Sequence, residues 1–288
     1  MKTNKLVFDI IRGMWLMSSF NILEYEKLAN RFLNGEKVGV EIDREAFRAS
    51  YENGNFGNTF NLSKPEEKQI GYLQMTGPMA TYGDGCTFGA DDYLFALREL
   101  NNNDKVSAIV LFVDGPGGAV SAINAFKEFK SEKKKPIVAL CNDCYSLHYW
   151  IVCLLADYVM AYGTVSSGFG SIGTTCMLID SREAMKNEGY KVMIINAEGS
   201  DLKNKAMQDF YEGKDEDFKK RIQAELTPIK GEFIADVKAG MPGISNDKRI
   251  FQADTFNAKQ ALELKMIHGI GNEKEAFEMA RVLGELNN

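Results

Sequence analysis

The residues best suited to chemistry in this chain are in a glycine-rich turn, Asp114–Gly118, with the sequence Asp-Gly-Pro-Gly-Gly. The apolar, β-branched run Val106–Val113 before it is typical of a buried strand, and Ala119–Lys130 after it has a helical pattern. Glycine lets the turn backbone approach a ligand, and the start of the helix directs free N–H groups into the same space. The turn could therefore bind an anion or stabilise an oxyanion. A strand-to-helix loop without any chemical role would have the same local sequence. The segments further along the chain must distinguish such a loop from an anion-binding turn.

The segments around this turn alternate between strand and helix patterns. The expected strands are Ile70–Gly77, Val106–Val113, Ile137–Cys141, Asp157–Tyr162, Thr175–Ile179, which follows a Gly-rich turn, Lys191–Asn196, and a short one near Ile267–Ile270. The expected helices are Ala90–Asn101, Ala119–Lys130, Ser146–Ala156, Ser181–Glu188, Asp215–Gly240, Thr255–Lys265 and Glu273–Leu286. This order predicts an α/β domain in which helices cover a mainly parallel sheet.

The first 68 residues have a different character, and we expect them to form a helical N-terminal arm followed by an Asn/Gly-rich linker. The expected parts are helical patterns at Asp9–Met17 and Ile22–Leu33, a polar extension at Val38–Arg48 and the linker at Ser50–Lys68. The main domain is expected to span residues 69–288. The run Leu6–Met17 contains Asp9 and Arg12, which a signal peptide would not.

The composition restricts the classes of function. The net charge of −6 and the pI near 5.2 provide no basic surface for nucleic acid. Five cysteines, an odd number without a disulfide spacing, fit a reducing compartment, and Cys141-x-x-Cys144 lacks the second ligand pair that a zinc site needs. No apolar run is long enough for a membrane span. We expect a cytoplasmic protein, or one inside an assembling particle, with no metal and no cofactor.

Four segments, in this order and spacing, resemble peptidase family S49, which includes signal peptide peptidase A and the phage head-maturation proteases. They are Asp114–Gly118, Ala156–Val159, Gly170–Thr174 and Ala258–Gly271. The resemblance covers roughly residues 69–285 and implies a ClpP/crotonase-like fold of repeated ββα units with a mainly parallel sheet. The segment Ile11–Trp15 is similar to the phage-type subgroup, which implies processing of capsid or scaffold proteins in a phage particle.

The family resemblance also implies a mechanism. A serine at the start of the buried helix attacks the peptide carbonyl, and a lysine that burial keeps neutral accepts its proton. The implied oxyanion donors are Gly117 and Gly118. The implied substrate-binding edge, where a peptide pairs as a β-strand, is formed by Gly170, Ser171, Ile172 and Gly173. The two histidines, at positions 148 and 268, are not in a recognisable Ser-His-Asp context.

The position of the nucleophile departs from the family pattern. Two independent spacings both lead to position 147, which is a leucine without a nucleophilic atom. A second register makes Ser146 the nucleophile, but it needs one residue deleted before the serine and one inserted after Ile151, which a π-bulge could absorb. In both registers the residues that follow are bulky, whereas the family has Gly or Ala there to leave room for substrate.

The general base has two candidates in the polar loop after the expected strand Lys191–Asn196. Lys203 fits the family spacing best, and Lys205 is the reserve candidate. Both could instead be ordinary surface lysines, which is the commonest position for this residue.

Three functions are compatible with these features. The first is an S49-type serine endopeptidase with a Ser146–Lys203 dyad that cleaves proteins, particularly phage or prophage capsid or scaffold proteins. The alternative is a catalytically inactive relative that serves as an oligomeric assembly or binding module, with Leu147 at the nucleophile position. A crotonase-type acyl-CoA enzyme is third, because no CoA-binding pattern is evident. The resemblance implies a ring-like homo-oligomer and a protein or peptide substrate.

Overall fold

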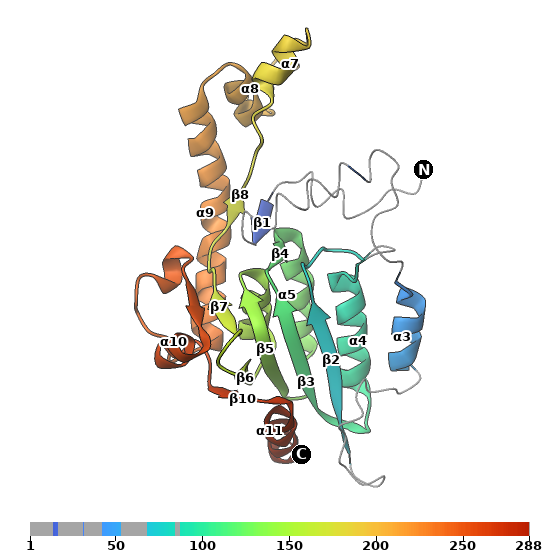
Figure 1. Ribbon diagram of the computed structural model, residues 1–288. Coiled ribbons are helices and arrows are strands. Elements are labelled where there is room, and N and C mark those ends of the chain that lie inside the picture. Colours follow the sequence, from blue (N-terminus) through green and yellow to red (C-terminus); the bar gives the residue numbers. More distant parts are fainter. Residues whose placement is uncertain (1–13, 17–30, 32–41, 53–67, 84–86, 288) are drawn as a thin grey trace.

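The computed structural model describes residues 14–16, 31, 42–52, 68–83 and 87–287. Its centre is a mainly parallel sheet with the strand order β10-β6-β5-β3-β2, extended by β7 on β5 and by β9 on β7 (Figure 1). The strands are β2 (Gln69–Thr76), β3 (Val106–Gly115), β5 (Ile137–Tyr145), β6 (Tyr158–Tyr162), β7 (Gly168–Gly170), β9 (Thr255–Asn257) and β10 (Gly269–Gly271). This sheet confirms the predicted α/β class.

Helices cover the sheet on both faces, and the central strand shows how. On β3, Ile109, Leu111 and Val113 belong to the core shared with α4, α5, α6 and α9. The alternate residues Ala108 and Val110 pack with α11 on the opposite face. Burial of both faces explains the unbroken apolar sequence of this strand. The helices around the sheet are α4 (Ala90–Asn102), α5 (Ile123–Glu132), α6 (Leu147–Leu155), α9 (Asp215–Gly240), α10 (Ala258–Glu263) and α11 (Glu273–Leu286).

Two predicted elements begin differently from expectation. A 3₁₀ turn at Val120–Ala122 precedes α5, so that helix starts four residues later than the pattern suggests. The expected helix Thr255–Lys265 is wrong at its start, because residues 255–257 form β9. Asn257 caps α10 by accepting the N–H of Gln260, which fixes the first helical turn at Ala258.

A second, small sheet lies at the carboxyl edge of the main one. It has the order β4-β1-β8, with β4 (Gly118–Ala119), β1 (Met14–Leu16) and β8 (Thr175–Cys176) all antiparallel to their neighbours (Figure 1). The helix expected over Asp9–Met17 is therefore wrong at residues 14–16. Pairing to two strand edges overrides the local helical spacing, because edge N–H and C=O groups require partners.

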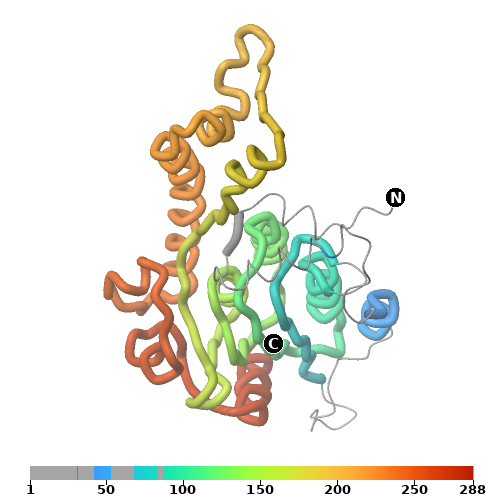
Figure 2. The backbone as a smooth tube through the Cα atoms, turned by 45° about the horizontal axis from the view of Figure 1, so that its top comes forward, coloured from blue at the N-terminus to red at the C-terminus, as the bar shows by residue number. Residues whose placement is uncertain are grey.

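An extended arm projects from this body. It consists of α7 (Arg182–Asn187), α8 (Lys205–Tyr211) and the segment between them, and it packs on the first turns of α9 (Figure 1; Figure 2). We call residues 178–214 the projecting arm. The strand expected over Lys191–Asn196 does not form there. A β-branched sequence needs a neighbouring strand to become a ladder, and in this chain no described strand pairs with it.

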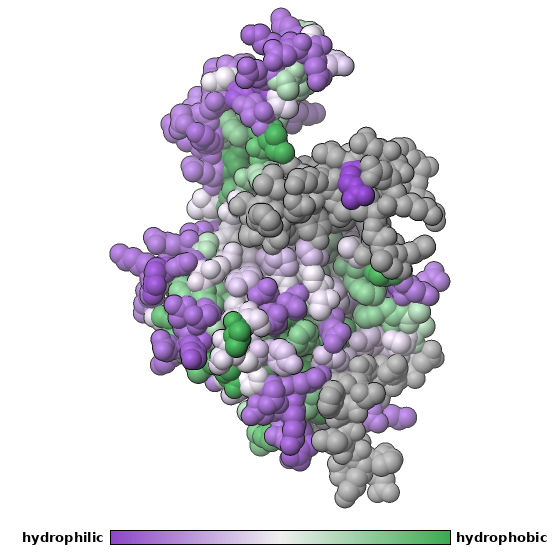
Figure 3. Space-filling model, viewed as in Figure 1, coloured by the Kyte–Doolittle hydropathy of each residue, from purple (hydrophilic) through white to green (hydrophobic). Residues whose placement is uncertain are grey.

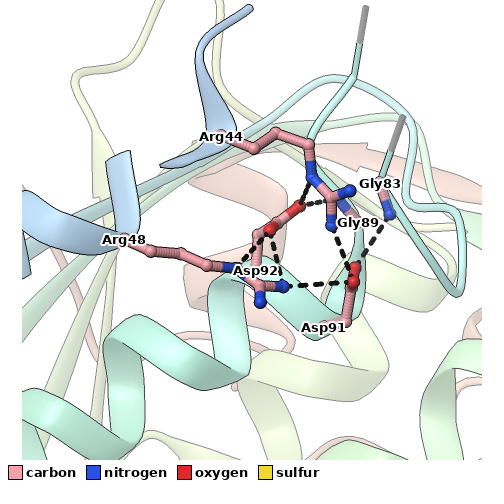
Figure 4. Close-up of polar contacts among 6 residues, drawn as sticks. All are labelled: Arg44, Arg48, Gly83, Gly89, Asp91 and Asp92. Carbon is pink, nitrogen blue, oxygen red and sulfur yellow. Dashed lines mark hydrogen bonds and ion pairs between the residues drawn. The ribbon is translucent and has the colours of Figure 1, made fainter. Parts of the chain in front are cut away.

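The helix α3 (Arg44–Glu52) is fastened to α4 by a buried charge cluster (Figure 4). Asp92, which is fully buried, accepts hydrogen bonds from Arg44 Nε at 2.7 Å and Arg48 Nε at 2.9 Å. Asp91 binds Arg44 Nη2 at 2.7 Å and the N–H of Gly83 at 2.8 Å. Residues 44–52, expected as polar extension and linker, are thus helical. The expected helix Ile22–Leu33 lies outside the described residues, except for Arg31, which is helical.

Candidate active site

Ser146 occupies a sharp turn between the end of β5 and the start of α6. Its backbone has φ 54° and ψ −116°, a conformation that is costly for a residue with a side chain. The turn is held on both sides: the Ser146 N–H donates to Gly170 O at 2.8 Å, and the Ser146 carbonyl accepts from Trp150 N–H at 2.9 Å. Strain of this kind costs on the order of 1–3 kcal/mol and is concentrated at active sites. A serine in a strained strand-to-helix turn is also the geometry of known nucleophile elbows.

Leu147 is part of the hydrophobic core. It is the first residue of α6 and is fully buried together with the other eight residues of this helix. The helix is continuous from Leu147 to Leu155, without the π-bulge after Ile151 that could absorb the extra residue of the second register. The structure therefore places Ser146, and not Leu147, at the turn.

The glycine-rich turn lies beside the start of α6, and its amide groups face different partners. Gly117 O accepts from Met79 N–H at 2.9 Å, and Ala119 N–H donates to Met79 O at 2.8 Å. Since amides alternate along an extended chain, the N–H and C=O of Gly118 face the opposite side, toward β1. A side chain on Gly118 would overlap the Met79 carbonyl, which explains the need for glycine at this position.

His148 contacts this turn directly, which the sequence did not reveal. Its Nδ1 accepts the N–H of Gly117 at 3.0 Å, so this predicted oxyanion donor is already occupied. Burial lowers the pKa of His148 to about 3, and the ring is neutral at pH 7. Because Nδ1 is the acceptor, the proton is on Nε2, which has no hydrogen-bond partner among the described groups. The only sequence signal was a bulky polar residue where the family has a small one.

The segment Gly170–Thr174 connects the serine turn to β8. The Gly170 carbonyl accepts a hydrogen bond from the Ser146 N–H. Ser171, which has a φ of 55°, donates its N–H to Asp254 O at 2.9 Å. Ile172 is fully buried and anchors the segment in the core, and Gly173 leads to β8. The structure thus brings together the serine turn, the glycine-rich turn and the proposed substrate-binding segment.

The two lysines lie elsewhere, in the projecting arm. Lys203 is exposed between α7 and α8, where its N–H donates to Ser200 O and its carbonyl accepts from Asn196 Nδ2. Lys205 Nζ is paired with Asp209 Oδ1 at 2.9 Å, and together with Arg221 it holds the pKa of Asp209 below its ordinary value. Since the arm points away from the body in both views, one chain by itself does not bring either lysine to Ser146 (Figure 1; Figure 2).

A cavity of about 510 Å³ separates β8 from the base of the arm. Its lining includes Thr175 and Cys176 of β8, the apolar residues Phe218 and Leu226 of α9, and the charged residues Arg182 and Asp215. The cavity continues from the edge of the small sheet and could accept a side chain of an extended peptide. In the described part of the chain, no cluster of three or more His, Cys, Asp or Glu side chains could hold a metal ion. None of the described helices is long and apolar enough to cross a membrane.

The sequence model of Peptidase family S49 matches residues 129–287, which is more than half of the chain. The chain belongs to peptidase family S49. The matched S49 region includes the serine turn, the segment after it, the projecting arm and the C-terminal helices, and it confirms the resemblance predicted from the sequence. The ClpP/crotonase-like architecture expected for an S49 chain agrees with the observed parallel sheet.

Individual relatives of this S49 chain are distant. It is 25% identical over 199 residues to the "Putative protease MJ0651" of Methanocaldococcus jannaschii, a match that covers 68% of this chain and 62% of that protein. Two solved structures are of the 1510-N membrane-bound stomatin-specific protease, one a lysine-to-alanine mutant with a substrate peptide and one a serine-to-alanine mutant. Both are 15% identical to this chain, with TM-scores of 0.44 and 0.45; they cover 72% and 74% of it, and 77% and 84% of their own chains.

Proposed function

We propose that this chain is a serine endopeptidase in which Ser146 is the nucleophile. The observation that carries the proposal is the strained turn at Ser146, which the strand β5, the helix α6 and the Gly170 carbonyl hold in place. A fold does not maintain a conformation of this cost at a serine unless the rest of the structure determines it, and such positions are concentrated at functional sites. Membership of family S49 supports the same reaction class.

The proposed oxyanion donors are the N–H groups of Gly118 and Leu147. The N–H of Gly118 points away from Met79 and toward β1, so it becomes available when β1 is displaced, as described below. Leu147 is the first residue of α6, whose first N–H groups have no acceptor within the helix. Gly117 cannot contribute while its N–H is bonded to His148. In the proposed reaction Ser146 Oγ attacks the peptide carbonyl and its proton passes to a lysine, which then protonates the leaving amine. Water hydrolyses the resulting acyl-enzyme by the same route.

The proposed base is Lys203 of a neighbouring copy in a homo-oligomer. The arm that carries it is exposed and has an unusual number of apolar side chains in water, including Met193 at 70%, Ile195 at 87% and Leu202 at 80% exposure. In Figure 3 the surface of the arm is mostly hydrophilic, with small hydrophobic patches near its tip and its base. A strand-like sequence without a partner strand and with exposed apolar residues is suited to pair with another copy. Lys205 is the weaker candidate because its Nζ is already paired with Asp209.

The proposed substrates are proteins that present an extended segment to the edges of β4 and β8, where backbone pairing would fix the chain. The N-terminal pattern Ile11–Trp15 supports capsid or scaffold proteins of a phage or prophage as those substrates. The proposed place of action is then the cytoplasm or an assembling phage particle.

The test is covalent labelling with a fluorophosphonate probe, measured by intact mass. The wild-type chain is expected to gain one probe, on Ser146, and Ser146→Ala to gain none. Ser166→Ala removes an exposed serine that bonds only Asn142 and is the matched control, with unchanged labelling expected. Labelling that persists in a folded Ser146→Ala chain would exclude Ser146 as the nucleophile.

A second candidate function is an inactive assembly module, which the bond between Gly117 and His148 favours. The His148 side chain fills the space that small residues leave open in the family, and its bond to the Gly117 N–H removes one oxyanion donor. The two candidates differ in one result. An oligomeric, folded wild-type chain that stays unlabelled, even when residues 14–16 are displaced as described below, would support the inactive module and contradict the peptidase.

A further inference from the structure

The strand β1 is paired along both of its edges. Leu16 is opposite Gly118 and Trp15 is opposite Ala119 on one side, while Met14 is opposite Cys176 on the other. Trp15 is also opposite Thr175, so a single residue bridges two strands that are distant in sequence. Figure 1 shows β1 between β4 and β8 at the top of the body.

The space that β1 occupies is one strand wide. Adjacent strands lie about 4.8 Å apart, so β4 and β8, which each pair with β1, are roughly 10 Å apart and cannot bond one another. The N–H and C=O of Gly118 face this gap, as the bonds of its neighbours to Met79 require. Without a strand in the gap, two backbone edges would lose their partners. The gap is therefore a channel for one extended chain, and because it binds backbone groups it accepts many sequences.

The direction of β1 leads it toward the serine turn. Its register descends from Ala119 to Gly118 on β4 and from Cys176 to Thr175 on β8, so its carboxyl end approaches Gly117 and Gly173. Both of those residues adjoin the Ser146 turn, through His148 and through Gly170. Ser146 is 1% exposed, so an external peptide can reach it only if part of the surrounding chain moves.

The segment is also tethered to the body. Fewer than thirty residues separate Leu16 from Arg44, where the buried charge cluster with Asp92 fastens α3 to α4 (Figure 4). Because the segment and the channel belong to one chain, their association is intramolecular, and a separate protein substrate must compete with it.

We propose that the channel between β4 and β8 is the peptide-binding site, and that the chain's own Met14–Leu16 segment is its resident occupant, which must leave before a protein substrate can bind. The role as substrate channel rests on the function proposed above, whereas occupancy by the segment rests on the pairing of β1 alone. The chain is thus regulated by a strand of its own, bound antiparallel to both β4 and β8.

The test uses full-length chains in a Ser146→Ala background, so that it does not depend on catalysis. Leu16→Pro removes the N–H that faces Gly118, and the matched Leu16→Ala keeps it. We expect the amides of Gly118 and of β8 to exchange with deuterium at least about tenfold faster in the proline variant than in the alanine variant. A synthetic peptide with the sequence of residues 12–20 should bind the proline variant at least about tenfold more tightly, and restore the protection. The same peptide with proline at the Leu16 position should not.

Equal exchange and equal peptide affinity in the two variants would overturn the proposal, because the segment would then not occupy the channel. A third readout separates this result from a failure of the proposed function. In chains with Ser146 intact, fluorophosphonate labelling should be faster in Leu16→Pro than in Leu16→Ala. If exchange and peptide binding change as expected but Ser146 remains unlabelled, the result supports occupancy of the channel by Met14–Leu16. It contradicts the assignment of Ser146 as the nucleophile.

Discussion

The body and the projecting arm of this molecule differ in how far they bury their apolar side chains and pair their backbone groups. In the body, every residue of α6 is buried and the serine turn is bonded on both sides. In the arm, Met193, Ile195 and Leu202 are mostly exposed to water. The strand-like sequence Lys191–Asn196 pairs with none of the described strands. The body buries most of its apolar side chains within one chain. The arm leaves apolar side chains exposed, which is typical of a surface that binds a partner.

This difference divides the proposed catalytic machinery. The nucleophile, the oxyanion donors and the peptide channel all belong to the body, whereas both candidate bases belong to the arm. Within a single chain, neither of the two candidate lysines lies at the strained serine. If assembly supplies the lysine, activity depends on oligomerisation, and an unassembled chain is harmless to other proteins. The occupant of the channel adds a second restraint on the same site.

The largest effect is expected from the base. Lys203→Met should slow labelling of Ser146 by about 10²–10⁴-fold, because general-base catalysis contributes this much. Lys205→Met is the matched control in the same loop and should stay within about threefold, since Lys205 pairs with Asp209. Equal losses in the two variants would indicate a structural effect on the loop.

The apolar surface of the arm is expected to act on assembly. Met193→Ser combined with Ile195→Ser should weaken oligomerisation about 100-fold, measured by analytical ultracentrifugation, because two exposed apolar side chains would no longer be buried between copies. The melting temperature should hardly change, since both side chains contact mainly water in the single chain. The pair Leu262→Ser and Val282→Ser, also exposed but in the body, is the control. Unchanged assembly in the arm variant would mean that the arm does not form the interface.

His148 is expected to give the body a dependence on pH. Its pKa, lowered by burial to about 3, is below the value near 6.5 of an unfolded histidine. The unfolded state then binds more protons, so the stabilisation is complete above about pH 6.5 and declines as the pH falls toward 3. The free energy of unfolding should drop by roughly 2–3 kcal/mol between pH 6.5 and 4.5. His148→Asn keeps an acceptor for Gly117, and its denaturation curves should lack this drop; an equal drop in both chains would contradict the assignment.

The smallest effect is expected from the charge cluster that holds α3. Asp92→Asn should lower the free energy of unfolding by about 2 kcal/mol, because a buried carboxylate loses two charge-assisted hydrogen bonds. Arg98→Met breaks a surface pair with Glu132 and should cost no more than about 1 kcal/mol. Both values come from urea denaturation monitored by circular dichroism. An unchanged free energy of unfolding in Asp92→Asn would show that the cluster does not stabilise the packing of α3 on α4.

The sequence predicted the body well for physical reasons. Strands such as Val106–Val113 are buried on both faces and helices such as α11 have a clear apolar stripe, so their patterns are local and strong. The α9 and α11 boundaries at residues 215–240 and 273–286 match the expected ones. Ser146 could be proposed because its position before a buried apolar helix is also local.

The rest depended on partners that are remote in sequence. The strand at Met14–Leu16 forms against residues more than a hundred positions away, and the bond between His148 and Gly117 crosses 31 positions. The expected strand Lys191–Asn196 is wrong for the converse reason, because its sequence has strand propensity but none of the described strands pairs with it. In all three cases the outcome depends on contacts with residues distant in sequence, and local periodicity does not predict such contacts.

The most direct test of the account is a mixing experiment with two inactive chains. Ser146→Ala retains Lys203, and Lys203→Met retains Ser146, so neither should be labelled by the fluorophosphonate probe alone. If the lysine comes from a neighbouring copy, co-assembly of equal amounts should restore labelling at about a quarter of all sites, since that share pairs an intact serine with an intact lysine. A co-assembled mixture that remains unlabelled would show that no serine receives its base from another chain, and would contradict the division between body and arm.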